Sequence, residues 1–491
     1  MQKREQWGSR AGFILAAIGS AIGLGNIWRF PYVAYENGGG AFFIPYLFAM
    51  ITAGIPFMIL EFGTGNKMRG SAPQIFSKLS PRWEWLGWWQ ILVSFTISIY
   101  YVAIVGWSIS YFFLAFNQGW GTDTSDFFYK SYLMLSDSPL DFKGIRWPIF
   151  ASVAGAWAIC WVVLFNGVKK GIEAASKIFM PALFILVVII TSRAVTLDGA
   201  SEGLNWMFKP DFSALLNFKV WVAAYGQIFF SLSIGFAIML TYSSYLPKDA
   251  DMANNGFITA FANCGFSILC GVLVFSILGN MAAQQGVGVD KVVSSGVGLA
   301  FVTIPKAINS LPGPAFFGTL FFLALIFAGL SSMVSICEVS VSSLMDKFHI
   351  SRKKAMTLYC LVGLVTGAVF ASHSGLLVLD IVDRFINNFG VLAGGLVEII
   401  FLTWVCKLSV FKDHINKTSD FYVGNFWTFC LKIVTPGVLG YMSVANLIGD
   451  LKTPYGDYSS TALFYFGWLL VVGIVVISFI FQAHSLAQNR R

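Results

Sequence analysis

The sequence contains few charged residues: Asp, Glu, Lys and Arg make up only 11% of its 491 positions. A soluble domain carries about 25% of these residues, because they keep its surface in water. Hydrophobic residues account for 57% of the chain, and the mean hydropathy is +0.72. A soluble globular protein is therefore excluded, and most of the surface is expected to face a lipid bilayer.

Paired cysteines and catalytic motifs are also missing. The seven cysteines form no Cys-x-x-Cys pair, lie in or beside apolar stretches, and have no histidine at ligand spacing. We therefore expect neither a disulfide framework nor a zinc site. An intramembrane enzyme needs a nucleophile with a base, an aspartate pair or a metal set. His373 lies in a short loop without a Gly-x-Ser-x-Gly motif, so the chain is not expected to be an enzyme.

Long apolar runs are what the sequence has in abundance. A helix of roughly 20 apolar residues crosses a bilayer, and about twelve such runs recur along the chain. They cover residues 11–36, 41–64, 86–116, 147–165, 172–192, 219–245, 256–281, 315–345, 355–371, 375–406, 425–448 and 461–482. The expected fold is an all-α polytopic membrane protein with about 12 transmembrane helices.

Basic residues lie beside alternate span ends. They are Lys3, Arg4 and Arg10; Lys67, Arg69, Lys78 and Arg82; Lys169 and Lys170; Lys347, Arg352, Lys353 and Lys354; Lys407, Lys412 and Lys417; and Arg490 and Arg491. The positive-inside rule then places both termini in the cytoplasm of a plasma or inner membrane. Topology thus explains the net charge of +8, and no nucleic-acid partner is expected. The first span follows a charged segment without a cleavage pattern, so it is predicted to stay in the protein.

Two predicted spans are interrupted by small and polar residues. The first contains GSAIGLGN at 19–26, and the sixth contains SLSIGF at 231–236. Single GxxxG patterns often serve close helix packing, but here three glycines crowd together and are followed by Asn26, Arg29 and Pro31. This pattern favours an unwound turn, which hydrocarbon tolerates only where protein or a water-filled site satisfies the backbone.

The two interruptions lie five spans apart. This spacing predicts two five-helix repeats of inverted topology, with broken helices 1 and 6 around a midplane site and transport by alternating access. The single transporter domain, 1–491, would contain one repeat at 11–192, the second at 219–406, and two further spans at 425–482.

The motifs at these interruptions resemble one known family. GSAIGLGNIWRFP at 19–31 is followed by ENGGGAFFIPY at 36–46, YGQIFFSLSIGF at 225–236, AGLSS at 328–332, and Asp380 with Asp383. Together they resemble the neurotransmitter:sodium symporter family, including its bacterial leucine-transporter-like branch, over essentially the whole chain. The resemblance implies sodium-coupled symport of an amino acid.

The resemblance also implies a substrate site between the two interruptions. The amino-acid carboxylate would bind Leu24, Gly25 and the hydroxyl of Tyr101, and the amine would bind carbonyls near Ala21 and Phe230 together with Ser233. Monoamine carriers of this family have an aspartate where this chain has Gly23, so a substrate with its own carboxylate is expected. The side-chain pocket would contain Ile97, Tyr101, Phe230, Phe236, Ser332 and Ile336. A charged substrate side chain would be desolvated there without a partner, which favours a neutral, hydrophobic amino acid.

By the same resemblance, two sodium ions are expected. The first site would use the Ala21 carbonyl, the Asn26 side chain, Ser231, Asn263 and the substrate carboxylate. The second would use the carbonyls of Gly19, Ile22 and Ala328 with the hydroxyls of Ser331 and Ser332. A serine hydroxyl in a helix usually bonds its own backbone instead, but here several hydroxyls cluster at two helix breaks.

Ionisable residues inside spans favour functional interpretations because they are costly in lipid. Arg29 and Asp383 resemble an outer gate pair, and Arg4 and Asp346 an inner pair, with Trp7, Ser244 and Tyr245 around them. Asp346 could instead only end a helix in water. Glu61, Glu338 and Glu398 are expected to be structural acids bonded to neighbouring helices.

Chloride is a further expected ligand. Chloride-dependent members of the family have a serine one helical turn after the asparagine of the first sodium site, and Ser267 follows Asn263 in this way. The donors would be Tyr46, Gln227, Ser231, Asn263 and Ser267. A proton or another carboxylate, such as Glu61, is the alternative counter-charge.

A ligand-gated channel or an amino-acid receptor of the same fold is the alternative function. Either would explain many spans with polar interiors. Neither would require a substrate carboxylate site joined to a sodium site.

Overall fold

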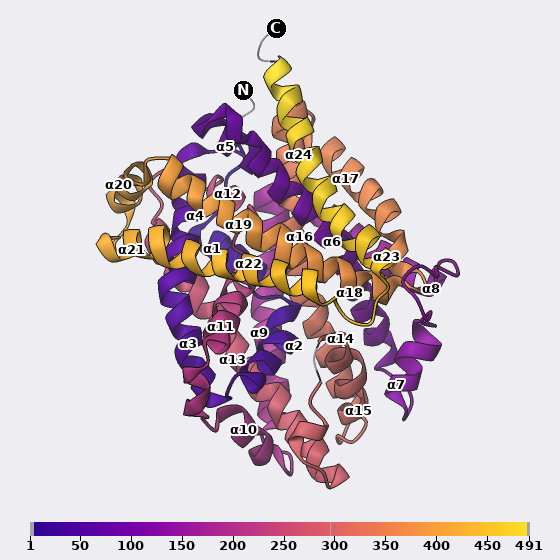
Figure 1. The fold of residues 1–491 in the computed structure, drawn as a ribbon. Coiled ribbons are helices and arrows are strands. Elements are labelled where there is room, and N and C mark those ends of the chain that lie inside the picture. The colour runs from indigo at the N-terminus through magenta and orange to yellow at the C-terminus, as the bar shows by residue number, and fades with distance from the viewer. Residues whose placement is uncertain (1–3, 295, 489–491) are drawn as a thin grey trace.

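The computed structural model describes residues 4–294 and 296–488, and helices make up most of it (Figure 1). Lys3, Arg490 and Arg491, on which the predicted topology partly depends, lie outside the described residues. The described residues contain no strand, apart from two isolated bridges between single residues. The prediction of an all-α chain is confirmed.

Ten helical stretches of the described chain are long and apolar enough to cross a membrane. They are Gly40–Met68, Pro81–Leu114, Trp147–Phe165, Val168–Ala194, Met252–Gln285, Pro314–Phe348, Arg352–Ala371, Gly375–Val405, Asn425–Lys452 and Ser460–His484. The bent pair α1 (Arg10–Ala21) and α2 (Leu24–Glu36) makes an eleventh span, with an angle of 52° between its halves.

The sixth predicted span, 219–245, is two shorter helices, α11 (Phe218–Ser231) and α12 (Ile238–Ser243). Both predicted interruptions are therefore present. The count of twelve spans stays a prediction, as do the inverted repeats.

Some of the long stretches are single α-helices, whereas π or 3-10 turns divide others into shorter ones. The long stretches contain the following α-helices. They are α3 (Phe43–Ala49), α4 (Ile55–Met68), α6 (Glu84–Leu114), α8 (Trp147–Phe165), α9 (Ala174–Ala194), α13 (Met252–Gln285), α16 (Pro314–Phe348), α17 (Arg352–Gly367), α18 (Gly375–Phe385), α19 (Leu392–Ile400), α21 (Asn425–Phe429), α22 (Thr435–Lys452), α23 (Ser460–Leu463) and α24 (Leu469–Gln488). The connecting segments contain α5 (Ala72–Leu79), α7 (Thr124–Asp126), α10 (Ala200–Phe208), α14 (Gly296–Gly298), α15 (Ile304–Ile308) and α20 (Leu408–Thr418).

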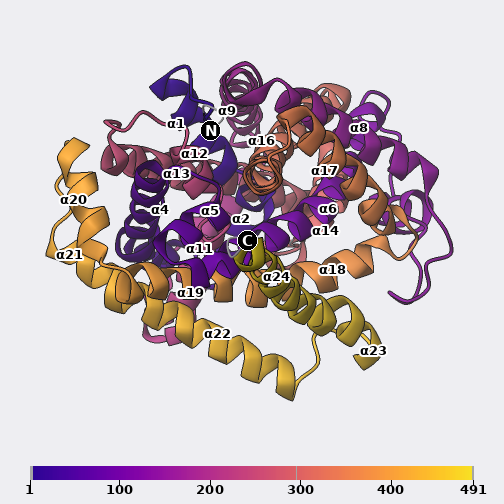
Figure 2. The same ribbon diagram turned by 90° about the horizontal axis from the view of Figure 1, so that it is seen from above.

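The interrupted helices lie at the centre of the bundle. α1 packs against α9, α13 and α16, and α16 packs along α6. α22 and α24 lie on the outside in both ribbon views (Figures 1 and 2). Only 17% and 22% of the apolar windows of the spans Asn425–Lys452 and Ser460–His484 are buried, against 83% for Pro314–Phe348. These outer faces are apolar, as expected for a surface in contact with lipid.

Close backbone contact between α10 and α13 depends on glycine. A Cβ atom added at Gly279 would lie 2.4 Å from the carbonyl oxygen of Gly199, whereas a Cβ at Gly265, on the same helix, would meet nothing within 4 Å. The two positions therefore make a matched pair for a packing test.

We expect Gly279→Ala to destabilise the protein by about 1–3 kcal/mol, because the added methyl group forces two backbones apart. Gly265→Ala should leave stability unchanged or raise it slightly, since alanine favours a helix more than glycine does. Thermal unfolding of the purified protein in detergent measures both. Equal midpoints for the two variants would contradict this account of the contact.

Candidate functional site

The interruption of the first span is local and extended. α1 ends at Ala21, Ile22 and Gly23 have extended backbones, and α2 begins at Leu24. A Cβ atom at Gly23 would lie 2.9 Å from Ser332 Oγ and 3.2 Å from the Tyr101 hydroxyl. The absence of a side chain at Gly23 therefore lets its backbone approach both hydroxyl groups.

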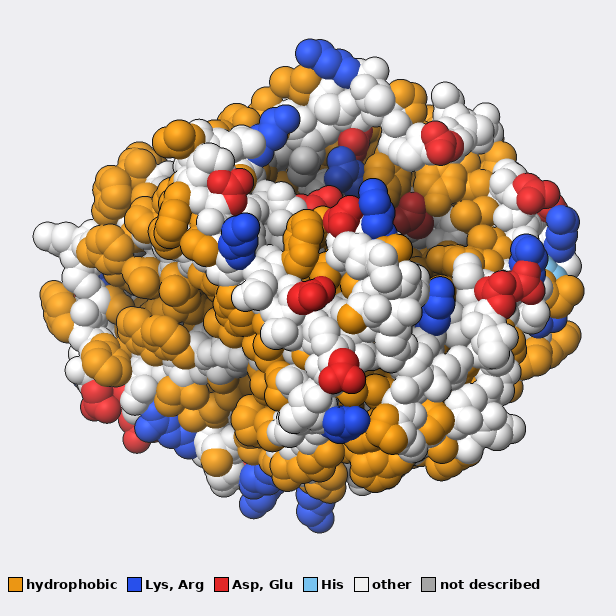
Figure 3. Space-filling model, turned by 90° about the horizontal axis from the view of Figure 1, so that it is seen from below, with side chains coloured by type: hydrophobic (Ala, Val, Ile, Leu, Met, Phe, Trp, Pro, Cys, Tyr) orange, Lys and Arg blue, Asp and Glu red, His pale blue; other side chains and the backbone are white. Residues whose placement is uncertain are grey.

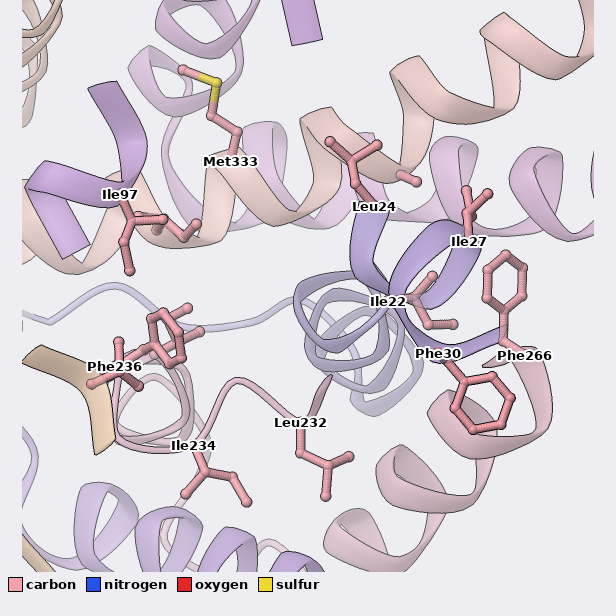
Figure 4. Packing of buried hydrophobic residues seen from close by; sticks show 14 of the residues in the cluster. Ile22, Leu24, Ile27, Phe30, Ile97, Leu232, Ile234, Phe236, Phe266 and Met333 are labelled. Carbon is pink, nitrogen blue, oxygen red and sulfur yellow. The ribbon is translucent and has the colours of Figure 1, made fainter. Parts of the chain in front are cut away.

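The interruption of the sixth span contains three left-handed residues. Ser233, Gly235 and Ala237 have φ values of 53°, 81° and 62°, between the end of α11 and the start of α12. Ser233 Oγ donates to the carbonyl oxygen of Ser20 at 3.0 Å, which joins the two interruptions directly. Apolar residues flank them, as Figure 4 shows for Ile22 and Leu24 on one segment and for Leu232, Ile234 and Phe236 on the other.

A cavity of about 700 Å³ lies between the interruptions. All eleven residues predicted for the substrate line it, namely Ala21, Gly23, Leu24, Gly25, Ile97, Tyr101, Phe230, Ser233, Phe236, Ser332 and Ile336. The backbone N–H of Leu24 donates to the Tyr101 hydroxyl at 3.4 Å, so the proposed carboxylate donors are adjacent. Sequence reasoning missed Tyr100, Ile104, Asn387 and Tyr455, which also line the cavity but lie outside the motifs.

The residues predicted for the first sodium ion form a buried polar cluster. Asn26 Nδ2 donates to Asn263 Oδ1 at 2.8 Å and to Ser231 Oγ at 3.2 Å. The Asn26 Oδ1 atom accepts the N–H of Gly23 at 2.8 Å, which ties the cluster to the first interruption. Ala21 lines the neighbouring cavity. The cluster offers amide, hydroxyl and carbonyl oxygens, which are the ligands that hard cations prefer.

Two of the carbonyl oxygens predicted for the second sodium ion, those of Gly19 and Ile22, lie around the Ser332 hydroxyl group together with the carbonyl oxygen of Ser20. Ser332 Oγ lies 3.4, 3.4 and 3.2 Å from the carbonyl oxygens of Gly19, Ser20 and Ile22. A single hydroxyl proton cannot satisfy three carbonyl oxygens at once, so the set suits a cation. Ser331 Oγ donates to the carbonyl of Ala328 at 3.0 Å.

Neither cluster depends on charged ligands. The described residues contain no group of three or more His, Cys, Asp or Glu side chains that could hold a metal ion. Neutral oxygen ligands fit sodium better than a transition metal.

The five residues predicted for chloride are buried beside Asn26. Asn26 Nδ2 donates to Ser267 Oγ at 2.8 Å, and Ser267 Oγ donates to the carbonyl of Asn263 at 3.1 Å. The Tyr46 hydroxyl and both polar atoms of the Gln227 side chain are buried and have no hydrogen-bond partner among the described residues. The unpartnered Tyr46 hydroxyl and Gln227 amide N–H groups are donors of the kind that an anion would require.

The face that carries the termini is closed by side-chain contacts. Arg4 Nη1 pairs with Asp346 Oδ2 at 3.0 Å, and Arg4 also donates to Ser244 Oγ at 2.8 Å. Its guanidinium lies 4.9 Å from the ring centroid of Tyr245, and Trp7 donates to the Tyr242 carbonyl. Asp346 accepts in addition the N–H of Ser71, so it does more than end a helix.

Lys78 lies outside the spans, on α5. Burial and the nearby positive charge of Arg4 lower the pKa of Lys78. Its ammonium group donates to the carbonyl oxygens of Met68 and Arg69.

The opposite face is hollowed, with acidic and basic side chains around the hollow (Figure 3). Arg29 and Asp383 both line the cavity but form no ion pair within the described chain. The Arg29 guanidinium lies 4.4 Å from the ring centroid of Phe230, and Asp383 accepts from Tyr100 at 2.7 Å and Asn387 at 2.9 Å. The residues of the predicted outer pair, Arg29 and Asp383, are thus apart, whereas those of the predicted inner pair, Arg4 and Asp346, form an ion pair.

Comparison with known proteins gives matches over the full length of the chain. The family model described as "Sodium:neurotransmitter symporter family" matches residues 4–124 and 121–488. An uncharacterized sodium-dependent transporter of Methanocaldococcus jannaschii is 43% identical over 98% of both chains.

Two animal relatives are each 30% identical to this chain. The sodium-dependent dopamine transporter of Caenorhabditis elegans matches over 93% of this chain and 82% of its own length. A sodium- and chloride-dependent GABA transporter of Drosophila melanogaster matches over 97% of this chain and 54% of its own length.

Arg4→Ala should loosen the closed face, because it removes the ion pair with Asp346 and the hydrogen bonds that Arg4 Nε and Nη2 donate to Ser244 Oγ. We expect a cysteine introduced at Ser176, which is 7% exposed on α9, to react several-fold faster with a soluble maleimide in this variant. Lys130→Ala, which breaks the exposed Lys130–Asp126 pair, is the control and should leave the rate unchanged. Identical rates in the Arg4 variant and its parent would show that these contacts do not hold the face closed.

Proposed function

Because the chain belongs to the sodium:neurotransmitter symporter family, we propose that it imports a neutral, hydrophobic amino acid with sodium by alternating access. Relatives of this chain are sodium-dependent transporters, and the chain itself is a multi-pass membrane protein. The observation that carries the substrate class is Gly23, where a Cβ atom would already meet Ser332 Oγ at 2.9 Å. Gly23 itself provides no acidic side chain, so the substrate would supply the carboxylate.

The start of α2 supports this assignment. The backbone N–H groups of Leu24 and Gly25 and the positive end of the helix dipole favour an anion. On the other side, carbonyls near Ala21 and Phe230 and the hydroxyl of Ser233 can accept from an ammonium group. The substrate's own side chain would then lie among Ile97, Phe236 and Ile336, where no ionised group would compensate a charge.

Two sodium ions would bind beside the substrate. The first would share the substrate carboxylate with Asn26, Ser231 and Asn263, and the second would lie among the carbonyls around Ser332. Sodium would thereby complete the substrate site, which couples the two ligands. The basic residues beside alternate span ends further support cytoplasmic termini, and the site would then face the outside of the cell in this conformation.

Asn26→Ala should weaken amino-acid binding and sodium binding together, each about 10-fold or more, because coupling between two ligands is reciprocal. Ligand-dependent thermal stabilisation, measured with and without sodium across the twenty amino acids, reports both affinities. Asn205→Ala, at an exposed position on α10, is the control. The first sodium site would be wrong if reconstituted Asn26→Ala protein showed unchanged sodium dependence of uptake.

The proposal of sodium symport would itself be wrong if vesicles that contain the wild-type protein concentrated the substrate without a sodium gradient.

Chloride would balance part of the added positive charge, which costs several kcal/mol in a low-dielectric site when uncompensated. We expect uptake to fall several-fold when gluconate replaces chloride at constant ionic strength. Ser267→Glu should remove this dependence, because a carboxylate then stands beside Asn26 and Asn263. Wild-type uptake and sodium affinity that are unchanged in gluconate would show that the anion is not required, and Glu61 or a proton would then be the counter-charge.

A further inference from the structure

Two glutamates that are not among the residues proposed to bind the substrate or the ions meet inside the bundle. Glu61 lies on α4 and Glu398 on α19, and both are 0% exposed. Their carboxyl groups are within hydrogen-bonding contact of each other. Two acids in contact, remote from water, require an explanation of how their charge is accommodated.

Each carboxyl group has one bonded and one unbonded oxygen. Glu61 Oε1 accepts the backbone N–H of Gly235 at 3.1 Å, and Glu398 Oε2 accepts the amide of Gln90 at 2.6 Å. The other two oxygens, Glu61 Oε2 and Glu398 Oε1, are buried and have no hydrogen-bond donor among the described residues. A buried acceptor without a donor is costly, and here two of them occur in one pair.

No cation compensates the pair in the described part of the chain. Neither glutamate takes part in a salt bridge, and their interacting groups are Gly235, Gln90 and each other. Glu338 provides the contrast, since it is equally buried but is bound by the Arg352 guanidinium at 2.6 and 2.8 Å. Two ionised carboxylates in contact would repel each other. They would also lose their hydration, and no cation would compensate for that loss.

One proton resolves both difficulties. Placed between Glu61 and Glu398, it removes one of the two negative charges and donates from one unbonded oxygen to the other. We propose that Glu61 and Glu398 form a proton-binding site that holds one shared proton and one net negative charge.

Glu61 of this pair also binds the backbone at the interruption of the sixth span. Gly235, whose N–H binds Glu61, lies in the left-handed stretch, and a Cβ atom added there would be 3.2 Å from the Cα of Gly395 on α19. The next residue, Phe236, lines the cavity. The proton-binding site therefore holds the backbone next to a residue that lines the cavity. This role does not depend on which ligand the cavity binds.

Infrared spectroscopy of the full-length protein in lipid vesicles at neutral pH tests the proposal. A protonated carboxyl group has a carbonyl stretching band that an ionised carboxylate lacks. Protein labelled with ¹³C-glutamate should show one such band, which shifts in D₂O. Glu61→Gln and Glu398→Gln should each abolish it, because the remaining glutamate ionises beside an amide that donates to it. Glu338→Gln is the control and should leave the band unchanged, since Arg352 already keeps that carboxylate ionised.

Two outcomes would overturn the shared proton. A wild-type spectrum without the labelled band would mean that both glutamates are ionised. A band that falls to about half in each single variant would mean that each glutamate holds its own proton. The labelled wild-type measurement needs no variant, so it decides between ionised and protonated acids even if a substitution prevents folding.

Discussion

Every part of the site depends on the satisfaction of backbone groups that the two interrupted helices leave free inside a membrane. Hydrocarbon offers no hydrogen bonds, so these groups must find partners in the protein. The structure supplies them by joining the interruptions to each other and to side chains: Ser233 to the Ser20 carbonyl, Asn26 to the Gly23 N–H, and Glu61 to the Gly235 N–H. The oxygens and N–H groups that remain around the cavity are those available to a ligand.

The two faces of the molecule are held in different ways. At the face with the termini, Arg4 bonds α12 and α16 together through Ser244 and Asp346, and aromatic rings fill the space around it. At the other face, Arg29 and Asp383 each have a different partner. The alternating access proposed above would exchange one set of contacts for the other, which is how a packed protein switches between two discrete arrangements.

The sequence predicted the fold class and both interruptions, because those features lie in local motifs. The family resemblance indicated eleven of the residues that line the cavity. Glycines crowded between Gly19 and Gly25 indicate an unwound turn without any knowledge of the neighbours. Contacts between distant residues were harder to predict. Arg29 was expected to face Asp383, but the separation of these residues depends on the conformational state, which a sequence does not contain. Glu61 and Glu398 were expected to be structural acids bonded to neighbouring helices, and nothing in the sequence indicates that the two meet.

The depth of the hollow has an electrical consequence. Water in a cavity that opens to one side would bring the potential of that side to the cavity floor, so the membrane voltage would fall mainly across the closed part between Ser332 and the Arg4–Asp346 pair. Moving one elementary charge through 100 mV is worth about 2.3 kcal/mol. A cation would thus reach the floor of the cavity almost without crossing the field, and the step that opens the closed layer would carry most of the voltage dependence.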